Sequence, residues 1–152
     1  MALTFGDGSS NQVNFGISPV AGRDATALTV LAWIYPTALT TNRRIWNRNG
    51  GAGSYRNFNI SSLGTARLSI FIEWTGDANA DSVNNTLLVN TWQFVGFTYA
   101  TPNVKLYYGT LAAAVAEVAY VANNAGVGSA VAEDTGVCEF RIGNQVSNDK
   151  GF

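Results

Sequence analysis

The chain has 152 residues, of which 47% are hydrophobic and 12% are charged, with nine Lys and Arg against ten Asp and Glu. A chain of this length can bury a core without disulfides or metals, and its balanced charge creates no field that would attract nucleic-acid phosphates or anionic lipid. We therefore expect one globular domain over residues 1–152, with neither nucleic acid nor a membrane as partner. The sequence shows no Sec signal peptide and no apolar run approaching the ~18 residues of a membrane span.

Short β-type segments separated by Gly, Asn, Asp, Ser and Pro clusters follow one another from residue 2, and this pattern predicts an all-β sandwich. Residues 67–74 alternate with a period of two, so Leu68, Ile70, Ile72 and Trp74 share one face. The segments 29–35 and 92–99 are apolar on both faces, as expected of central strands, which places Trp33 and Trp92 in the core. The predicted strands are ALTF, QVNF, ALTVLAWIYP, RIWNR, YRNFNI, RLSIFIEW, TWQFVGFTY, NVKLYYG and CEFRIG.

The segment 111–122 fits two patterns. Leu111, Ala114, Val115, Val118 and Ala122 follow the stripe of an amphipathic helix, whereas a strand would give a poorer alternation. Because a lone helix would interrupt an all-β order, we predict a strand here.

Taken in order, several pieces resemble the concanavalin A-like lectin and glucanase superfamily, in particular its laminin-G-like and pentraxin-like branch. They are ALTFGDGSSNQVNFG, LTVLAWIYP, RRIWNRNG, TWQFVGFTYATPNVKLYYG and FRIGN. The resemblance implies a jelly-roll β-sandwich of two antiparallel sheets, in a family that mostly binds glycans or protein surfaces, sometimes with calcium. The chain departs from the family at LYYGT, where a Leu-Tyr-x-Asn-Gly turn is usual, and at KGF, where members continue into a last strand.

Catalysis is not favoured by the acidic residues. Glycoside hydrolysis needs two carboxylates flanking one bond, and glucanases of the resembling superfamily carry them on one strand as Glu-x-Asp-x-x-Glu. Glu73 stands alone, Glu133 and Asp134 are adjacent in a loop, and Glu139 is isolated. The chain has no His, and its single Cys138 lies in a strand-like run where it is expected to pack in the core. We predict that the protein is not an enzyme.

Calcium is the one cofactor that the sequence suggests. Asp77, Asn79 and Asp81 place oxygen ligands at alternate positions, and a tight loop could turn them toward one hard cation. The alternative is a polar loop whose side chains cap their own turns. The family's rim site would instead point to Asp7 with Asp149 as a neighbour.

A glycan site needs an exposed aromatic face with planar polar groups beside it. Trp46 is flanked by such groups, and Trp74 ends its strand next to the acidic loop. Either Trp is alternatively a core residue. The candidate ligand-binding residues are Arg44, Trp46, Asn47, Arg48 and Trp74, with Arg43 and Arg56 completing a basic cluster.

Two functions of different class remain open. The first is a structural subunit at a virion or extracellular surface, such as a virion decoration or fibre protein, and the second is a carbohydrate-binding adhesin. Only QVSNDKGF follows the Ile-Gly-Asn turn, so the last strand of the family is expected to be missing beside residues 2–5. Because native sheets avoid bare edges, we predict that further chain, a protein partner or a homo-oligomer completes the sheet by β-augmentation.

Overall fold

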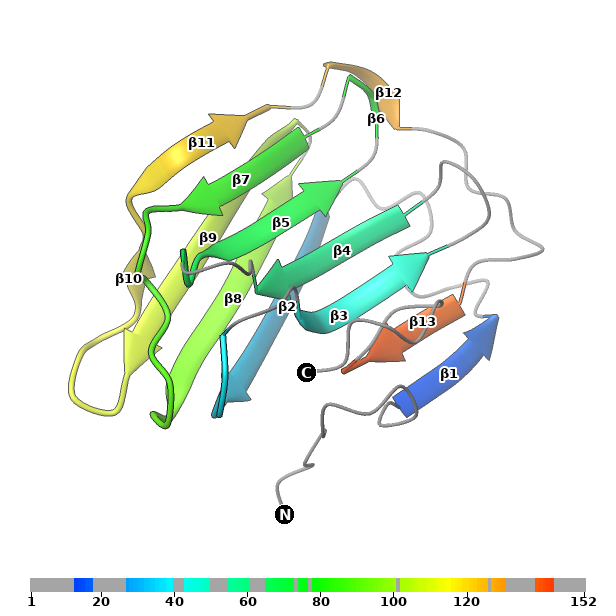
Figure 1. Cartoon of the computed structure of the whole chain (residues 1–152). Coiled ribbons are helices and arrows are strands. Elements are labelled where there is room, and N and C mark those ends of the chain that lie inside the picture. Colours follow the sequence, from blue (N-terminus) through cyan, green and yellow to red (C-terminus); the bar gives the residue numbers. More distant parts are fainter. Residues whose placement is uncertain are drawn as a thin grey trace.

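The computed structural model describes residues 13–17, 27–39, 43–49, 55–60, 65–72, 74–76, 78–100, 102–125, 127–130 and 139–143, and every regular element among them is a β-strand (Figure 1). None of these residues belongs to a helix that could cross a membrane. The strands are β1 (Val13–Ile17), β2 (Ala27–Ile34), β3 (Arg43–Asn49), β4 (Tyr55–Ile60), β5 (Leu68–Ile72), β6 (Trp74–Gly76), β7 (Ala78–Ser82), β8 (Gln93–Ala100), β9 (Asn103–Thr110), β10 (Ala116–Glu117), β11 (Tyr120–Asn124), β12 (Val127–Ala130) and β13 (Glu139–Ile142).

The strands form two antiparallel sheets that lie in two layers, with a short β12-β6 ribbon at one end (Figure 1). The larger sheet has seven strands in the order β1-β13-β3-β4-β5-β7-β11, and the smaller has four in the order β10-β9-β8-β2. The predicted β-sandwich is therefore confirmed.

Alternation builds the core between the layers. Strands β5 and β7 bury every second residue, and β8 buries Val95 and Phe97 completely. The Trp46 ring of β3 meets the Phe97 ring of β8 at a centroid distance of 5.9 Å, which joins the two sheets directly. Side chains spaced in this way leave one face of each sheet for the core and the other for solvent. The buried core consists of Ile34, Ile45, Trp46, Leu68, Ile70, Ile72, Ala78, Ala80, Leu87, Val95, Phe97, Tyr99, Val104 and Leu106.

Two polar or ambiguous segments form strands. Residues 78–82, which the sequence suggested as a loop, form β7 between β5 and β11. The segment 111–122 is not helical: it contains the two-residue β10 and the start of β11, so the strand prediction holds for part of it. Short side chains at Ala78 and Ala80 allow β7 to pack flat against the opposite sheet, and hydropathy patterns detect such residues poorly.

The prediction that Trp33 and Trp92 lie in the core is wrong. Strand β8 lies inside the four-stranded sheet as predicted, but β2 ends that sheet among the described strands, so the prediction that 29–35 is a central strand is wrong. The side chain of Trp33 is 51% exposed and that of Trp92 is 42% exposed. Ile34 is the buried member of β2, so Trp33 points to the other face. An apolar pattern on both faces of a strand does not reveal which face the second sheet covers.

Several predictions fall outside the described residues. They concern the first strand at 2–5, the thiol of Cys138, the carboxylates Glu73, Glu133 and Asp134, the rim pair Asp7 and Asp149, and the chain end after Gly143.

Candidate binding surfaces

The outer face of the four-stranded sheet carries a group of large apolar side chains, which we call the aromatic face. Strand β2 and the residue after it supply the alternate positions Leu31, Trp33 and Tyr35, and the residue before β8 and the second residue of β8 supply Trp92 and Phe94. Leu31 is 58% exposed and Tyr35 is 43% exposed, while Phe94 is half-buried. Exposed apolar residues are common singly, but five on one face form a patch of the kind that marks interaction sites.

Ring contacts hold this face in place. Trp33 and Phe94 are register partners across β2 and β8, and their rings meet edge to face at 5.8 Å. Tyr35 and Trp92 meet at 5.5 Å with a tilt of 52°. Such aromatic pairs contribute ~0.5–1.5 kcal/mol beyond area burial, so the exposed rings are ordered before a partner arrives.

Two glycines shape the same face. A Cβ on Gly96 would lie 2.7 Å from Leu31 Cδ2, and one on Gly109 would lie 2.9 Å from Val115 Cγ2. Leu31 therefore lies flat over β8, and Val115 lies flat over β9. Because Gly96 and Gly109 have no side chains, Leu31 and Val115 lie close to the backbones of β8 and β9, and they extend the apolar surface beside the rings.

The turn before β8 positions Trp92. Gln93 is fully buried, its Oε1 accepts a hydrogen bond from the Leu88 N–H at 2.9 Å, and its Nε2 donates to the Leu88 carbonyl at 2.6 Å. The N–H of Asn90, which has a positive φ of 52°, donates to the Pro36 carbonyl at 2.7 Å. These bonds tie the turn to the end of β2, which brings Trp92 beside Tyr35.

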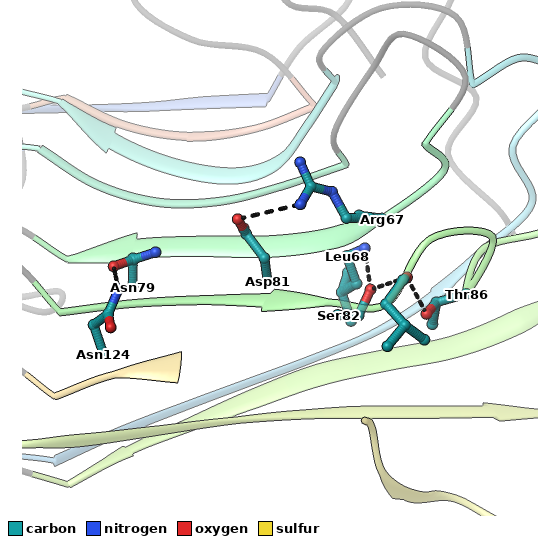
Figure 2. A network of polar contacts seen from close by, with 8 residues as sticks. Arg67, Leu68, Asn79, Asp81, Ser82, Thr86 and Asn124 are labelled. Carbon is teal, nitrogen blue, oxygen red and sulfur yellow. Dashed lines mark hydrogen bonds and ion pairs between the residues drawn. The ribbon is translucent and has the colours of Figure 1, made fainter. Parts of the chain in front are cut away.

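Two polar pairs lie on the seven-stranded sheet, on strands β7 and β11 and the residue before β5 (Figure 2). Arg67 lies 3.7 Å from Asp81 across β5 and β7, and Asn124 Nδ2 donates to Asn79 Oδ1 at 2.8 Å across β7 and β11. Beside them, Ser82 Oγ accepts the Leu68 N–H at 2.9 Å and donates to the Val83 carbonyl at 3.1 Å. These two hydrogen bonds of Ser82 lie inside the protein, and they connect the turn after β7 to the start of β5.

Register places amide residues in one row across this sheet. Asn47, Asn57, Phe71, Asn79 and Asn124 are successive partners across β3, β4, β5, β7 and β11. Neighbouring strands are ~4.8 Å apart, so the row repeats a polar residue at close intervals on either side of Phe71. Asn47 is 2% exposed, and its Nδ2 has no hydrogen-bond partner. Because Asn47 is buried, the members of the row that reach solvent are Phe71, Asn79 and Asn124, and these form a second candidate surface.

The predicted ligand residues are only partly brought together. Trp46 is 4% exposed and packs on Phe97, so it belongs to the core and offers no free ring to a sugar. Asn47, on the opposite side of β3, belongs to the polar row, and Arg44 is half-buried on the same strand. The backbones of Arg48 and Trp74 lie in β3 and β6, and that of Arg56 lies in β4, but their side chains are outside the described set.

The suggested calcium ligands lie in a strand instead of a tight loop. Asn79 and Asp81 are alternate residues of β7, and Asp77 falls outside the described residues. Asn79 Oδ1 accepts the Asn124 amide, and Asp81 is paired with Arg67. Among the described residues, no group of three or more His, Cys, Asp or Glu side chains could hold a metal ion.

Glu117 lies in β10 at one edge of the four-stranded sheet, where it binds two neighbouring side chains. Glu117 Oε2 lies 3.0 Å from Lys105 Nζ, and its Oε1 accepts the Tyr120 hydroxyl at 3.0 Å. Tyr120 in turn accepts the Leu106 N–H at 2.9 Å. The hydrogen bond from Lys105 lowers the pKa of Glu117, and burial is the main cause that raises the pKa of Tyr120 to about 12. Asp81 and Glu117 thus lie on different sheets, and each has a cationic partner.

Comparison with known proteins agrees with this architecture. The sequence profile of a laminin-G-like family in the concanavalin A-like lectin/glucanases superfamily matches residues 7–149. The chain belongs to this family. The solved structure of domains LG4-5 of the mouse laminin α1 chain superposes with a TM-score of 0.58 at 15% identity, over 97% of this chain and 37% of that one. At this identity the likeness concerns the fold alone, and no curated protein sequence matches the chain.

This laminin-G-like domain carries its aromatic face where sequence analysis did not place a site. The sequence did contain one indication of this face. In the segment 27–35, Trp33 and Tyr35 are at odd-numbered positions with Leu31, so all three side chains point to the same side of the strand. Alternation alone does not show whether the odd-numbered or the even-numbered residues face the core, because the even-numbered Leu28, Val30 and Ile34 are also apolar.

Proposed function

We propose that this laminin-G-like domain is a non-catalytic binding and assembly module that contacts another protein through its aromatic face. The observation that carries the proposal is the exposure of Leu31, Trp33, Tyr35 and Trp92 on one face. Interface centres are enriched in aromatic residues and depleted of charge, and three of these four residues are aromatic and none is charged. A structural subunit of a particle, such as a virion decoration or fibre protein, is the role that we favour.

The size of the face fits the centre of such an interface. Aromatic side chains bury ~150–250 Å² each, so three half-exposed rings present about 300 Å². Burying that area would contribute on the order of 7 kcal/mol before the cost of association, at ~25 cal/mol per Å². A standard interface buries ~800 Å² per partner, so polar contacts around the rings would complete it.

Site-specific photocrosslinking tests this function. A benzophenone side chain replaces Trp33 in one variant and Asn103 in a matched control, because Asn103 is exposed at the start of β9, which β8 separates from β2. In the native source, we expect one protein to be crosslinked from position 33 and not from position 103. Identical crosslinks from both positions, or none from position 33, would contradict the proposal.

The polar row supports a second candidate, carbohydrate binding. Planar amides match sugar hydroxyls, and Phe71 is the register partner of Asn79, which accepts the Asn124 amide at the surface. Glycan-array binding and calorimetry, each with and without calcium, test this candidate in Asn124→Ala. The control is Asn123→Ala, whose register partner is the inward-facing Ala80. Binding that only Asn124→Ala weakens would favour the adhesin role, whereas binding that neither variant affects would remove the row as the site.

A further inference from the structure

Three connections meet at one end of the four-stranded sheet, where β2 ends, β8 begins and β9 ends (Figure 1). The register pairs Ile34 with Gln93 and Gln93 with Thr110, so the residues just beyond these strand ends come together. The connections carry five exposed apolar side chains, which we call the apolar end: Tyr35, Leu88, Val89, Trp92 and Leu111. Tyr35 and Trp92 also belong to the aromatic face, and the three aliphatic residues extend the apolar surface beyond the strands.

The apolar end combines aliphatic turn residues with a pair of amphipathic rings. Leu111, in the bend after β9, is 80% exposed, which is the highest value for a large apolar side chain among the described residues. Leu88 and Val89 are nearly half-exposed in the turn before β8. Trp92 and Tyr35 lie at the strand ends with their rings in contact. This composition is typical of segments at a lipid interface, where aliphatic side chains enter the acyl layer and Trp and Tyr rings lie at the level of the headgroups.

The described residues of the four-stranded sheet carry no charge close to the apolar end. The segments 27–39 and 83–104 contain no Asp, Glu, Lys or Arg, and neither does the bend after β9. The nearest charges on this sheet are Lys105 and Glu117, which pair with each other at 3.0 Å. Glu117 faces Tyr107 in register, so ~10 Å of β9 separates it from the end of that strand. Interfacial segments enter the headgroup and acyl boundary by ~5–10 Å, so the apolar end can enter it without removing these charges from water.

Both turns at the apolar end form hydrogen bonds to their own backbone groups. In the bend after β9, Thr110 Oγ1 accepts the N–H groups of Ala112 and Ala113 at 3.2 and 3.0 Å, and the Thr110 N–H donates to the Ala113 carbonyl at 3.1 Å. In the turn before β8, the Gln93 side chain binds both the N–H and the carbonyl of Leu88. A turn in water can leave such groups to the solvent, whereas a segment that enters lipid must satisfy them within the protein. The hydrogen bonding of these turns therefore favours a lipid environment.

We propose that the apolar end inserts into the surface of an electrically neutral membrane, such as one of phosphatidylcholine. The occupant follows from charge: the apolar end offers no cation to an anionic headgroup and no anion that a neutral surface would exclude. The expectation of no membrane partner rested on the absence of a field that would attract anionic lipid, and insertion into neutral lipid needs no such field. This contact goes beyond the proposed protein contact, because the three aliphatic residues lie outside the aromatic face.

Flotation of the full chain with phosphatidylcholine vesicles tests the insertion, together with the wavelength of tryptophan emission. We expect the unmodified chain to float with the vesicles and its emission to shift to shorter wavelength as Trp92 leaves water. Leu111→Asp should weaken vesicle binding at least about tenfold, because it places a charge in the acyl boundary. Leu31→Asp is the matched control, since Leu31 is also an exposed leucine but lies within β2, and it should leave vesicle binding unchanged. Val89→Asp repeats the test in the other turn.

Several outcomes would overturn this proposal. They are an unmodified chain that stays out of the vesicle fraction, equal vesicle binding by Leu111→Asp and the unmodified chain, and binding that appears only when anionic phosphatidylglycerol is added. Self-association that Leu111→Asp abolishes, without vesicle binding, would instead assign the apolar end to a second copy of the chain. Crosslinking from position 33 reports on the proposed protein contact separately, and Leu111→Asp should leave it unchanged, so either idea can fail without the other.

Discussion

Among the three tryptophans whose side chains the structure describes, we predict that Trp46 is the one whose replacement by Ala destabilises the protein most. The Trp46 side chain is 4% exposed and meets Phe97 across the two sheets. A buried aromatic removes ~150–250 Å² from water, which corresponds to ~4–6 kcal/mol at ~25 cal/mol per Å². Measured losses for Trp→Ala in cores are ~3–5 kcal/mol, and we expect the loss of unfolding free energy to lie in that range.

Urea unfolding followed by far-UV circular dichroism measures this loss without depending on the altered fluorophore. For a domain of this size, ~3–5 kcal/mol corresponds to a decrease in Tm of roughly 6–20 °C. Trp33→Ala is the matched control, because Trp33 is also a strand residue but is half-exposed, and we expect it to cost ~1–2 kcal/mol. Equal losses for the two variants, or a smaller loss for Trp46→Ala, would refute the assignment of Trp46 to the core.

Four further substitutions test other parts of the structure. Ser82→Ala leaves the buried Leu68 N–H without an acceptor, so urea unfolding should show a loss of ~1–3 kcal/mol, and an unchanged midpoint would contradict this. A Cβ at Gly109 would lie 3.0–3.1 Å from two Val115 backbone atoms, and one at Gly96 would lie 3.0 Å from the Val30 carbonyl oxygen, so Gly109→Ala and Gly96→Ala should each lower the Tm, and an unchanged Tm in either variant would contradict this close packing. Tyr120 has a folded pKa of about 12 against an ordinary value of 10, so its stabilising contribution is complete below pH 10 and is lost as pH rises through 12. Unfolding free energies across this pH range should therefore fall more steeply for the unmodified chain than for Tyr120→Phe, and parallel curves would argue against the burial of this phenol.

The sequence predicts the strands well where apolar alternation is strong. Strand β5 illustrates this, since Leu68, Ile70 and Ile72 alternate and are all buried. Strand β7 was missed because its inward residues are alanines and a serine, and its outward residues, Asn79 and Asp81, are typical of loops. Small inward side chains make a strand look polar, although they pack as closely as larger ones.

The candidate surfaces were harder to predict, for a different reason. Sequence analysis proposed Trp46 as a ligand residue from its polar neighbours and assigned Trp33 to the core from its apolar neighbours, and the structure shows the reverse. Neighbours along a strand alternate between faces, so they say little about the environment of one side chain. The partners that decide it are Phe97 for Trp46 and Phe94 for Trp33, and both are distant in sequence.

The distance along the chain between β2 and β8 has a consequence for biosynthesis. Strand β2 is made early, but its partner begins only at Gln93 and ends at Ala100. At ~5–20 residues per second, the ribosome needs on the order of 3–12 s to synthesise the chain between them. During that interval Ala27–Ile34 is an uncharged apolar segment with both strand edges free, which is the kind of segment that holdase chaperones bind. Production of this domain should therefore depend on chaperone capacity and translation speed more than its final stability would suggest.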